Sequence, residues 1–266
     1  MKPKILLAIL AKQQAPLLPL YLRCIEHQSY PKDRIHLWVR TNNNTDDTAE
    51  ILKFWLERVG WQYAGVTFDD TDAPQPVQNY SKHDWAPERF SVLNPIRQAS
   101  LNATLEHGCD AYFVVDCDNF LLPHTLATLI DRHTDEVHGQ LNHITAPMLN
   151  CCDPDRPHYS NFHGDIDERG WYRESKLYWD LLGRQIWGEL VPVVHCTYLV
   201  PAWAIPLLRY ENPGGYDGRY DYVVFSESAR ESGVGQWLDS SRPFGCLTFK
   251  DGPEAAIRWR KEMGFW

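Results

Sequence analysis

The stretch AYFVVDCDNFLLP (111–123) decides how the whole chain is interpreted. Its first five residues, 111–115, are apolar or aromatic and run directly into Asp116 and Asp118. A short continuous run of this kind is typical of a strand that is buried on both faces of a parallel sheet. In such open sheets, ligands bind beyond the carboxyl ends of the strands. The two carboxylates therefore either form an ordinary acidic turn or hold a ligand.

The residues before this stretch alternate between strand and helix patterns. Apolar runs predict strands over 4–11, 34–41, 61–68 and 111–115, and helical spacing predicts helices over 16–28, 42–60 and 95–108. Asn94 is expected to cap the third helix, with Pro95 in its first position. Residues 69–86 have no periodicity, which indicates a long loop of the kind that is often functional. The alternation predicts an α/β fold with a Rossmann-like, mostly parallel sheet that is flanked by helices.

The regular alternation of strand and helix patterns ends after residue 150. Residues 151–179 are polar, aromatic and irregular, whereas 189–200 reads as one more strand and 220–233 as a helix that opens at Asp221. We expect one continuous domain over 1–266. A nucleotide-binding half (1–120) would be followed by an acceptor-binding half (121–266).

Bulk composition excludes several classes of protein. The net charge is −9 and we find no basic stripe, which argues against nucleic-acid binding. Seven cysteines without a C-x-x-C pair indicate a reduced chain rather than a disulfide scaffold or a zinc module. The first apolar run is too short for a signal peptide, and no stretch is long enough for a transmembrane helix. We therefore expect a soluble, cytoplasmic protein.

The spacing of Asp116 and Asp118 favours a cation. Side chains at i and i+2 of a strand lie on the same side, so both carboxylates can converge on one ion if the backbone stays extended. Mn²⁺ and Mg²⁺ prefer carboxylate oxygen and leave positions open for substrate phosphates. Such an ion can neutralise the diphosphate that leaves a nucleotide sugar. An acidic protein could bind an acidic donor in this way.

Several blocks of the chain resemble, in the same order, the procollagen galactosyltransferase family, which is similar to the glycosyltransferase domain of the multifunctional lysyl hydroxylases. The blocks are 37–56, 89–119, 114–130, 146–149, 159–164, 170–175, 191–200 and 220–225. The resemblance implies a GT-A fold and an inverting transfer of galactose from UDP-galactose, assisted by Mn²⁺ or, as an alternative, Mg²⁺. Eukaryotic members of the family act on hydroxylysine of collagen. For this chain the expected acceptor is a hydroxyl group of a sugar, a glycan or a peptide.

Donor-binding candidates are of three kinds. The expected set comprises the strand-end residues Leu10 and Ala11, the turn residues Thr41, Asn42 and Asn44, the helix residue Arg97, and Asp116, Cys117 and Asp118. Short amides suit hydrogen bonds to uracil or ribose, although an Asn-rich turn that caps the next helix explains the same residues equally well. Arg97 could reach the ribose or the diphosphate as a fixed cation. The alternative for Arg97 is a solvated position on its helix.

The remaining candidates concern catalysis and the acceptor. Asp221 resembles the second residue of an acidic pair in the family, whose first position is Tyr220 here, and it is the predicted general base. A helix N-cap is the alternative for Asp221. His195 is the predicted third metal ligand or an acceptor contact, unless it is a core residue. Further acceptor-binding candidates are Asn161, Trp171 and Tyr172.

Two other functions fit part of the pattern. A haloacid-dehalogenase-type phosphatase also has D-x-D after an apolar strand, with the first Asp as nucleophile. That motif normally continues with Thr or Val and stands near the start of its fold, whereas Asn119 follows here. A non-catalytic sugar- or protein-binding module on a glycosyltransferase scaffold is the other alternative, because Tyr220 replaces an acidic residue.

Overall fold

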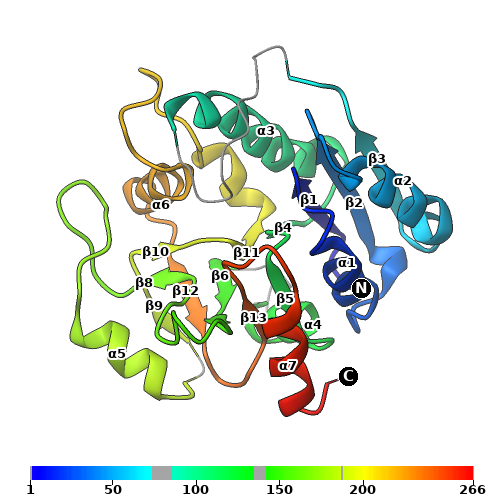
Figure 1. Cartoon of the computed structure of the whole chain (residues 1–266). Coiled ribbons are helices and arrows are strands. Elements are labelled where there is room, and N and C mark those ends of the chain that lie inside the picture. The colour runs from blue at the N-terminus through cyan, green and yellow to red at the C-terminus, as the bar shows by residue number, and fades with distance from the viewer. Residues whose placement is uncertain (1, 74–85, 135–141, 187, 266) are drawn as a thin grey trace.

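The computed structural model describes residues 2–73, 86–134, 142–186 and 188–265 (Figure 1). In chain order the elements are β1 (Ile5–Ala11), α1 (Leu18–Glu26), η1 (Lys32–Arg34), β2 (Ile35–Thr41), α2 (Thr48–Val59), η2 (Gly60–Gln62), β3 (Gly65–Asp69), α3 (Pro87–Glu106), β4 (Ala111–Val115), β5 (Asn119–Leu121), α4 (Thr125–His133), β6 (Ile144–Pro147), β7 (Asn150–Cys151), β8 (Phe162–His163), α5 (Lys176–Gly183), β9 (Glu189–Leu190), β10 (Val193–Val194), β11 (Thr197–Pro201), η3 (Ala202–Leu207), α6 (Asp221–Glu231), β12 (Gln236–Asp239), β13 (Gly245–Leu247) and α7 (Glu254–Glu262).

Eight of these strands form the central sheet, in the order β3-β2-β1-β4-β11-β6-β12-β9. β1 pairs in parallel with β2 and β4, and β2 pairs in parallel with β3. β11 enters antiparallel between β4 and β6. Because β1, β2 and β4 run the same way, the residues that follow Ala11, Thr41 and Val115 meet at one edge of the sheet.

Alternating residues of the central strands face two separate cores. Ile5, Leu7 and Ile9 of β1 pack in a core with α1, α2 and the small sheet β5-β13-β7, whereas Leu6 and Ala8 pack in a second core with α3, α5 and α6. All five side chains are fully buried. This explains why β1 has no polar alternation: both of its faces are covered, as expected for a central parallel strand. Figure 1 shows α3 and α6 at one end of the molecule and α7 at the other.

The structure confirms the predicted β-α alternation through β4 and the predicted helix at Asp221. The third helix starts earlier than expected, at Pro87, so Asn94 and Pro95 lie inside α3 rather than at its start. Phe90 explains the extension, because its buried ring stacks on Tyr216 and Tyr220 from the second half of the chain. Tertiary packing therefore outweighs the local proline signal.

Two predicted strands differ from those observed. The run 61–68 begins as η2, and its strand starts only at Gly65. The run 189–200 is divided into β9, β10 and β11. Cys196 adopts a left-handed φ of 65°, which turns the chain between β10 and β11 and sends them into different sheets. Of the predicted loop 69–86, residues 74–85 lie outside the described part of the chain.

Other expectations can be compared directly with the fold. All seven cysteines are free, so no disulfide contributes to the structure. Among the described residues, no helix combines the length and apolar character needed to cross a membrane. The halves 1–120 and 121–266 share the central sheet, since β6, β9, β11 and β12 extend the sheet that β1 to β4 begin.

Candidate functional site

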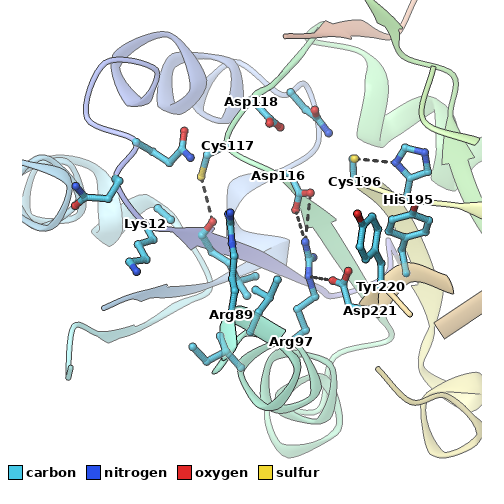
Figure 2. Close-up of a pocket in the computed structure, with 18 of the residues that line it drawn as sticks. Lys12, Arg89, Arg97, Asp116, Cys117, Asp118, His195, Cys196, Tyr220 and Asp221 are labelled. Atoms are coloured by element: carbon cyan, nitrogen blue, oxygen red, sulfur yellow. Dashed lines mark hydrogen bonds and ion pairs between the residues drawn. The ribbon is translucent and has the colours of Figure 1, made fainter. Parts of the chain in front are cut away.

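A cavity of about 590 Å³ lies at the carboxyl edge of β1, β2 and β4. Its volume is in the range of small-molecule sites. Its walls come from the end of β1, one face of α3, the Asp116–Asp118 segment, the bend before β11, the start of α6 and residues 247–251 (Figure 2). The cavity therefore joins both halves of the chain at the position where an open α/β sheet is expected to bind its ligand.

The Asp116–Asp118 segment is a turn and not the extended strand on which the shared-face prediction depended. The Asn119 amide donates to the Asp116 carbonyl at 2.9 Å, and β5 starts directly afterwards. Cys117 is buried in the turn, with its thiol 3.4 Å from the Leu10 carbonyl oxygen. Both carboxylates nevertheless line the cavity. The turn, rather than the two-residue repeat of a strand, brings them together.

Arg97 connects this turn to α6. Its Nε lies 2.5 Å from Asp221 Oδ2, and its Nη2 lies 3.1 Å from Asp116 Oδ1 (Figure 2). The Arg97 and Asp221 side chains are only 11% and 7% exposed. Burial alone would lower the pKa of Arg97, but Asp116 and Asp221 raise it well above its ordinary value. The alternative of a solvated position for Arg97 is thus wrong, because the guanidinium is a buried bridge between two carboxylates.

The carboxyl of Asp116 is electrostatically unusual. Burial raises the pKa of Asp116 to about 6, and the neighbouring Asp118 and Asp221 carboxylates add to the rise against the opposing effect of Arg97. Arg97 is thus paired with two carboxylates, Asp116 and Asp221, which leaves an excess of negative charge. A divalent cation would offset that excess, and hard cations of this kind often use only one or two protein carboxylates together with substrate phosphates. Asp116 and Asp118 therefore fit the predicted metal as a two-carboxylate donor set.

His195 lines the same cavity but is held by its neighbours. It is 3% exposed, and its Nδ1 lies 2.9 Å from the Cys196 sulfur. Burial, with smaller contributions from His163 and Arg97, lowers the pKa of His195 well below 6.5, so its imidazole is neutral at neutral pH. Within the described ranges, no group of three or more His, Cys, Asp or Glu side chains is arranged to hold a metal. The role of His195 as third ligand stays a prediction.

Asp221 lies in the first turn of α6 and does not cap the helix. The N-cap residue is Tyr220, which makes no side-chain cap hydrogen bond. The helix N-terminus favours a negative charge at this position. The N-cap alternative for Asp221 is therefore wrong. The Arg97 ion pair fixes its carboxylate at the cavity wall, on the same side of the Asp116 turn as His195 and Tyr220 (Figure 2).

The opposite end of the cavity is built by two connected turns. Gln13, with a left-handed φ of 55°, exchanges hydrogen bonds with Thr45, and its backbone amide donates to Asn44 Oδ1. Asn44 also donates to the Thr41 hydroxyl at 2.6 Å. Thr41 and Asn44 therefore stabilise the turn and do not belong to the cavity lining, so their role as donor contacts stays a prediction. Asn42 does line the cavity, together with the predicted Leu10 and Ala11.

Positive side chains line this end, and one of them, Arg40, is paired with Asp69. Lys12 follows β1 and Arg89 projects from the first turn of α3, and both line the cavity (Figure 2). Partial burial and the proximity of Arg89 lower the pKa of Lys12. The cavity thus has a basic end and an acidic end. Arg89 was not predicted, because it falls before the helix start that Asn94 and Pro95 suggested.

The structure places the further acceptor candidates, Asn161, Trp171 and Tyr172, in different surroundings, all of them outside the cavity lining. Asn161 is fully buried; its amide donates to Pro147 O, and its Oδ1 accepts from Leu149 N. These hydrogen bonds give Asn161 a structural role, and its acceptor-binding role stays a prediction. Trp171 and Tyr172 also lie outside the lining, in a hairpin beside the cavity. Trp171 packs edge-on against Tyr220, which does line it.

Several lining residues have no signal in the sequence. The segment 247–251 reaches the cavity because β13 pairs with β5, directly after the acidic turn. Thr248 N donates to Asp118 O at 3.1 Å and anchors this contact. Tyr222 also lines the cavity without a signal in the sequence. It follows Asp221 on α6, and only tertiary packing decides which residues surround it.

Solved structures with a similar fold include two glycosyltransferases. The mannosyltransferase PcManGT from Pyrobaculum calidifontis, in complex with GDP-Man and Mn²⁺, matches with a TM-score of 0.54 and 15% identity over 98% of this chain and 60% of that one. TarS 1–349 of S. aureus, in complex with UDP, matches with a TM-score of 0.55 and 14% identity over 96% of this chain and 62% of that one. At this identity the likeness concerns the fold alone, which is the GT-A glycosyltransferase fold.

Curated relatives are closer in sequence. Procollagen galactosyltransferase 2 of Mus musculus is 32% identical over 97% of this chain, and inactive glycosyltransferase 25 family member 3 of the same species is 31% identical over 97%. The chain spans 40% and 43% of the lengths of these two relatives. The sequence signature described as "Glycosyltransferase family 25, N-terminal domain" matches residues 2–258. With its GT-A fold and a match over nearly its whole length, this chain belongs to glycosyltransferase family 25.

Proposed function

We propose that this chain is a Mn²⁺-dependent inverting glycosyltransferase that moves a hexose, most simply galactose, from a UDP-sugar to an acceptor hydroxyl. The observation that supports it best is the Asp116–Arg97–Asp221 bridge at the wall of the cavity. It places a carboxylate of the acidic turn and a carboxylate of α6 on either side of one guanidinium. A donor and an acceptor could therefore meet between them.

Each end of the cavity has its own part in this proposal. Lys12 and Arg89 would attract the anionic donor, and Asn42 offers an amide to its nucleoside. Asp116 and Asp118 would hold the cation, with His195 as the predicted third ligand. When bound, the metal would supply positive charge that stabilises the leaving diphosphate.

Asp221 is the proposed general base. It would take the proton of the acceptor hydroxyl as that oxygen attacks the anomeric carbon, on the face opposite the leaving UDP. Arg97 would act as a positioning residue, since its ion pair fixes the Asp221 carboxylate. A base held in place in this way needs little reorganisation when the acceptor binds.

A UDP-release screen tests the proposal. The purified chain would be incubated with UDP-galactose, UDP-glucose and UDP-N-acetylglucosamine, each with Mn²⁺ or with a chelator, and with mixed acceptors. We expect release from UDP-galactose that needs the metal. Release that is unaffected by chelation would contradict the metal dependence, and a preference for another sugar would reassign the donor.

A non-catalytic binding module is the second candidate. It is favoured by one observation: some relatives, such as family member 3 of Mus musculus, are described as inactive. Calorimetry separates the two functions. UDP binding together with no donor turnover across a broad set of acceptors would favour the binding module.

A further inference from the structure

Four aromatic side chains lie next to one another at the acidic end of the cavity. This aromatic strip consists of Tyr159, His195, Tyr222 and Tyr220, all of which line the cavity. Ring centroids are separated by 6.0 Å between Tyr159 and His195, 4.9 Å between His195 and Tyr222, and 5.9 Å between Tyr222 and Tyr220. The three tyrosines are partly exposed. Their rings therefore present area to a ligand instead of only filling a core.

The strip lies where an acceptor would have to bind. Tyr220 and Tyr222 flank Asp221, the proposed base, in the sequence at the start of α6. Figure 2 shows Tyr220 and His195 on the side of Asp116 that faces away from Lys12 and Arg89. A donor held between the basic end and the acidic turn would leave the three tyrosines of the strip uncovered.

Two hydroxyl groups of the strip are available to a ligand. In the part of the chain that the structure describes, Tyr159 and Tyr222 make ring contacts but no hydrogen bond through their hydroxyls. A buried phenol normally finds a hydrogen-bond partner. Burial raises the pKa of both phenols above 10, so each keeps its proton at neutral pH and can both donate and accept.

Neighbouring rings hold the strip in place. His163 packs edge-on against Tyr222, with the ring planes at 87° and the centroids 5.7 Å apart. Tyr220 stacks on Phe90 from α3 and meets Trp171 edge-on, and Tyr159 meets Phe249 edge-on. Because these contacts come from separate elements, the ring positions are fixed before any ligand binds. Such preorganisation reduces the entropic cost of binding.

We propose that the acceptor is an uncharged carbohydrate, whose pyranose ring packs its C–H face on the aromatic strip while its hydroxyls bond to Tyr159 and Tyr222. The strip itself contains no Lys, Arg, Asp or Glu side chain. The adjacent Asp116 and Asp221 are already paired with Arg97. A pyranose ring offers such a surface a broad C–H face and several hydroxyls, whereas a single side-chain hydroxyl of a peptide offers little area that can pack on it. The role of this sugar as the acceptor rests on the proposed function, whereas its binding to the aromatic strip does not.

Transfer assays compare the acceptor classes directly. With UDP-galactose and Mn²⁺, the acceptors would be methyl glycosides of common neutral hexoses, a hydroxylysine-containing peptide and a threonine-containing peptide. We expect transfer to at least one glycoside and weaker transfer to both peptides. Transfer to the hydroxylysine peptide with none to any glycoside would overturn the inference while leaving the proposed glycosyltransferase activity intact.

Variants of Tyr222 test the strip itself. Tyr222→Ala removes both ring and hydroxyl and should raise the KM for the glycoside about tenfold or more, since a packing contact and a hydrogen bond are lost together. Tyr222→Phe keeps the ring and should raise the KM for the glycoside only severalfold. The KM for UDP-galactose should change less than twofold in both Tyr222 variants. Trp61→Ala is the control, because Trp61 is 80% exposed and lies outside the cavity lining. An unchanged acceptor KM in Tyr222→Ala would contradict the inference.

Binding measurements keep the inference testable if no donor is turned over. Ligand-observed NMR of the same methyl glycosides, with UDP present, should show binding to the wild-type chain and a clear loss in Tyr222→Ala. Tyr222→Phe covers the case in which the alanine variant does not fold. Binding without turnover would overturn the proposed activity alone, whereas the absence of glycoside binding would overturn the acceptor assignment.

Discussion

The two ends of the cavity are built from different kinds of contact. At the basic end, Gln13, Asn44 and Thr45 join neighbouring turns that follow adjacent strands, so the wall is local and exposed. At the acidic end, Arg97 joins a turn and a helix that are more than 100 residues apart in the sequence, and the Arg97 and Asp221 side chains are almost fully buried. Electrostatic contacts are stronger at a buried site than at an exposed one. Substitutions at the acidic end should therefore have the larger effects.

The largest effect is expected for Asp221→Asn. This change keeps the shape of the side chain but removes its capacity to accept a proton, and losing a general base typically reduces turnover by about 10²- to 10⁴-fold. Single-turnover transfer from UDP-galactose measures the change. Asp180→Asn on α5, outside the cavity lining, is the matched control and should keep full activity. Full activity in Asp221→Asn would reject its role as base.

The next effect concerns the free energy of unfolding. Arg97→Ala leaves Asp116 and Asp221 without their shared counter-ion in a buried position, and breaking such a pair costs about 3–5 kcal/mol. Arg173→Ala breaks the exposed pair with Asp165, which should change stability by only about 0–1 kcal/mol. Urea unfolding of both variants measures the difference. Similar losses in the two variants would mean that the acidic end is not the more strongly coupled one.

A smaller effect should appear as a pH dependence of stability in metal-free buffer. The pKa of Asp116 is about 6 in the folded chain and 3.8 when unperturbed, so between these values the folded state binds more protons than the unfolded state. Stability should therefore fall as pH rises from about 4 to 6, by up to about 3 kcal/mol from this group. The slope of the free energy of unfolding against pH should become flatter in Asp116→Asn. Equal slopes for the wild type and the variant in urea unfolding between pH 4.5 and 7 would contradict the raised pKa.

The smallest effect is expected at the basic end. Lys12→Ala removes one partly exposed cation from the donor side, and a screened charge contact of this kind is worth about 1 kcal/mol, or roughly fivefold in the KM for UDP-galactose. The effect should shrink at high salt. Lys53→Ala on α2, whose partner is Asp70, serves as the surface control. An effect of Lys12→Ala as large as that of Asp221→Asn would reverse the ranking of the two ends.

Residues close together in the sequence were predicted best. The apolar runs at 4–11 and 111–115 predicted central strands correctly, because strands covered on both faces have no polar alternation. Parallel pairing then fixed the common edge at which Ala11, Thr41 and Val115 end. The acidic pair at that edge, the absence of disulfides and the family resemblance were also available from the sequence.

The chemistry at that edge was decided by tertiary structure. Arg97 could not be assigned its two carboxylates from helical spacing, because Asp221 comes from an element 124 positions further along the chain. The left-handed Cys196 divides a run that reads as a single strand, and the pairing of β13 with β5 brings residues 247–251 to the cavity. Local periodicity records which face of an element is buried, but not which distant element covers it. The sequence by itself therefore determined the parallel part of the sheet and the edge at which the cavity lies, whereas long-range packing decided which charges and aromatic rings meet there.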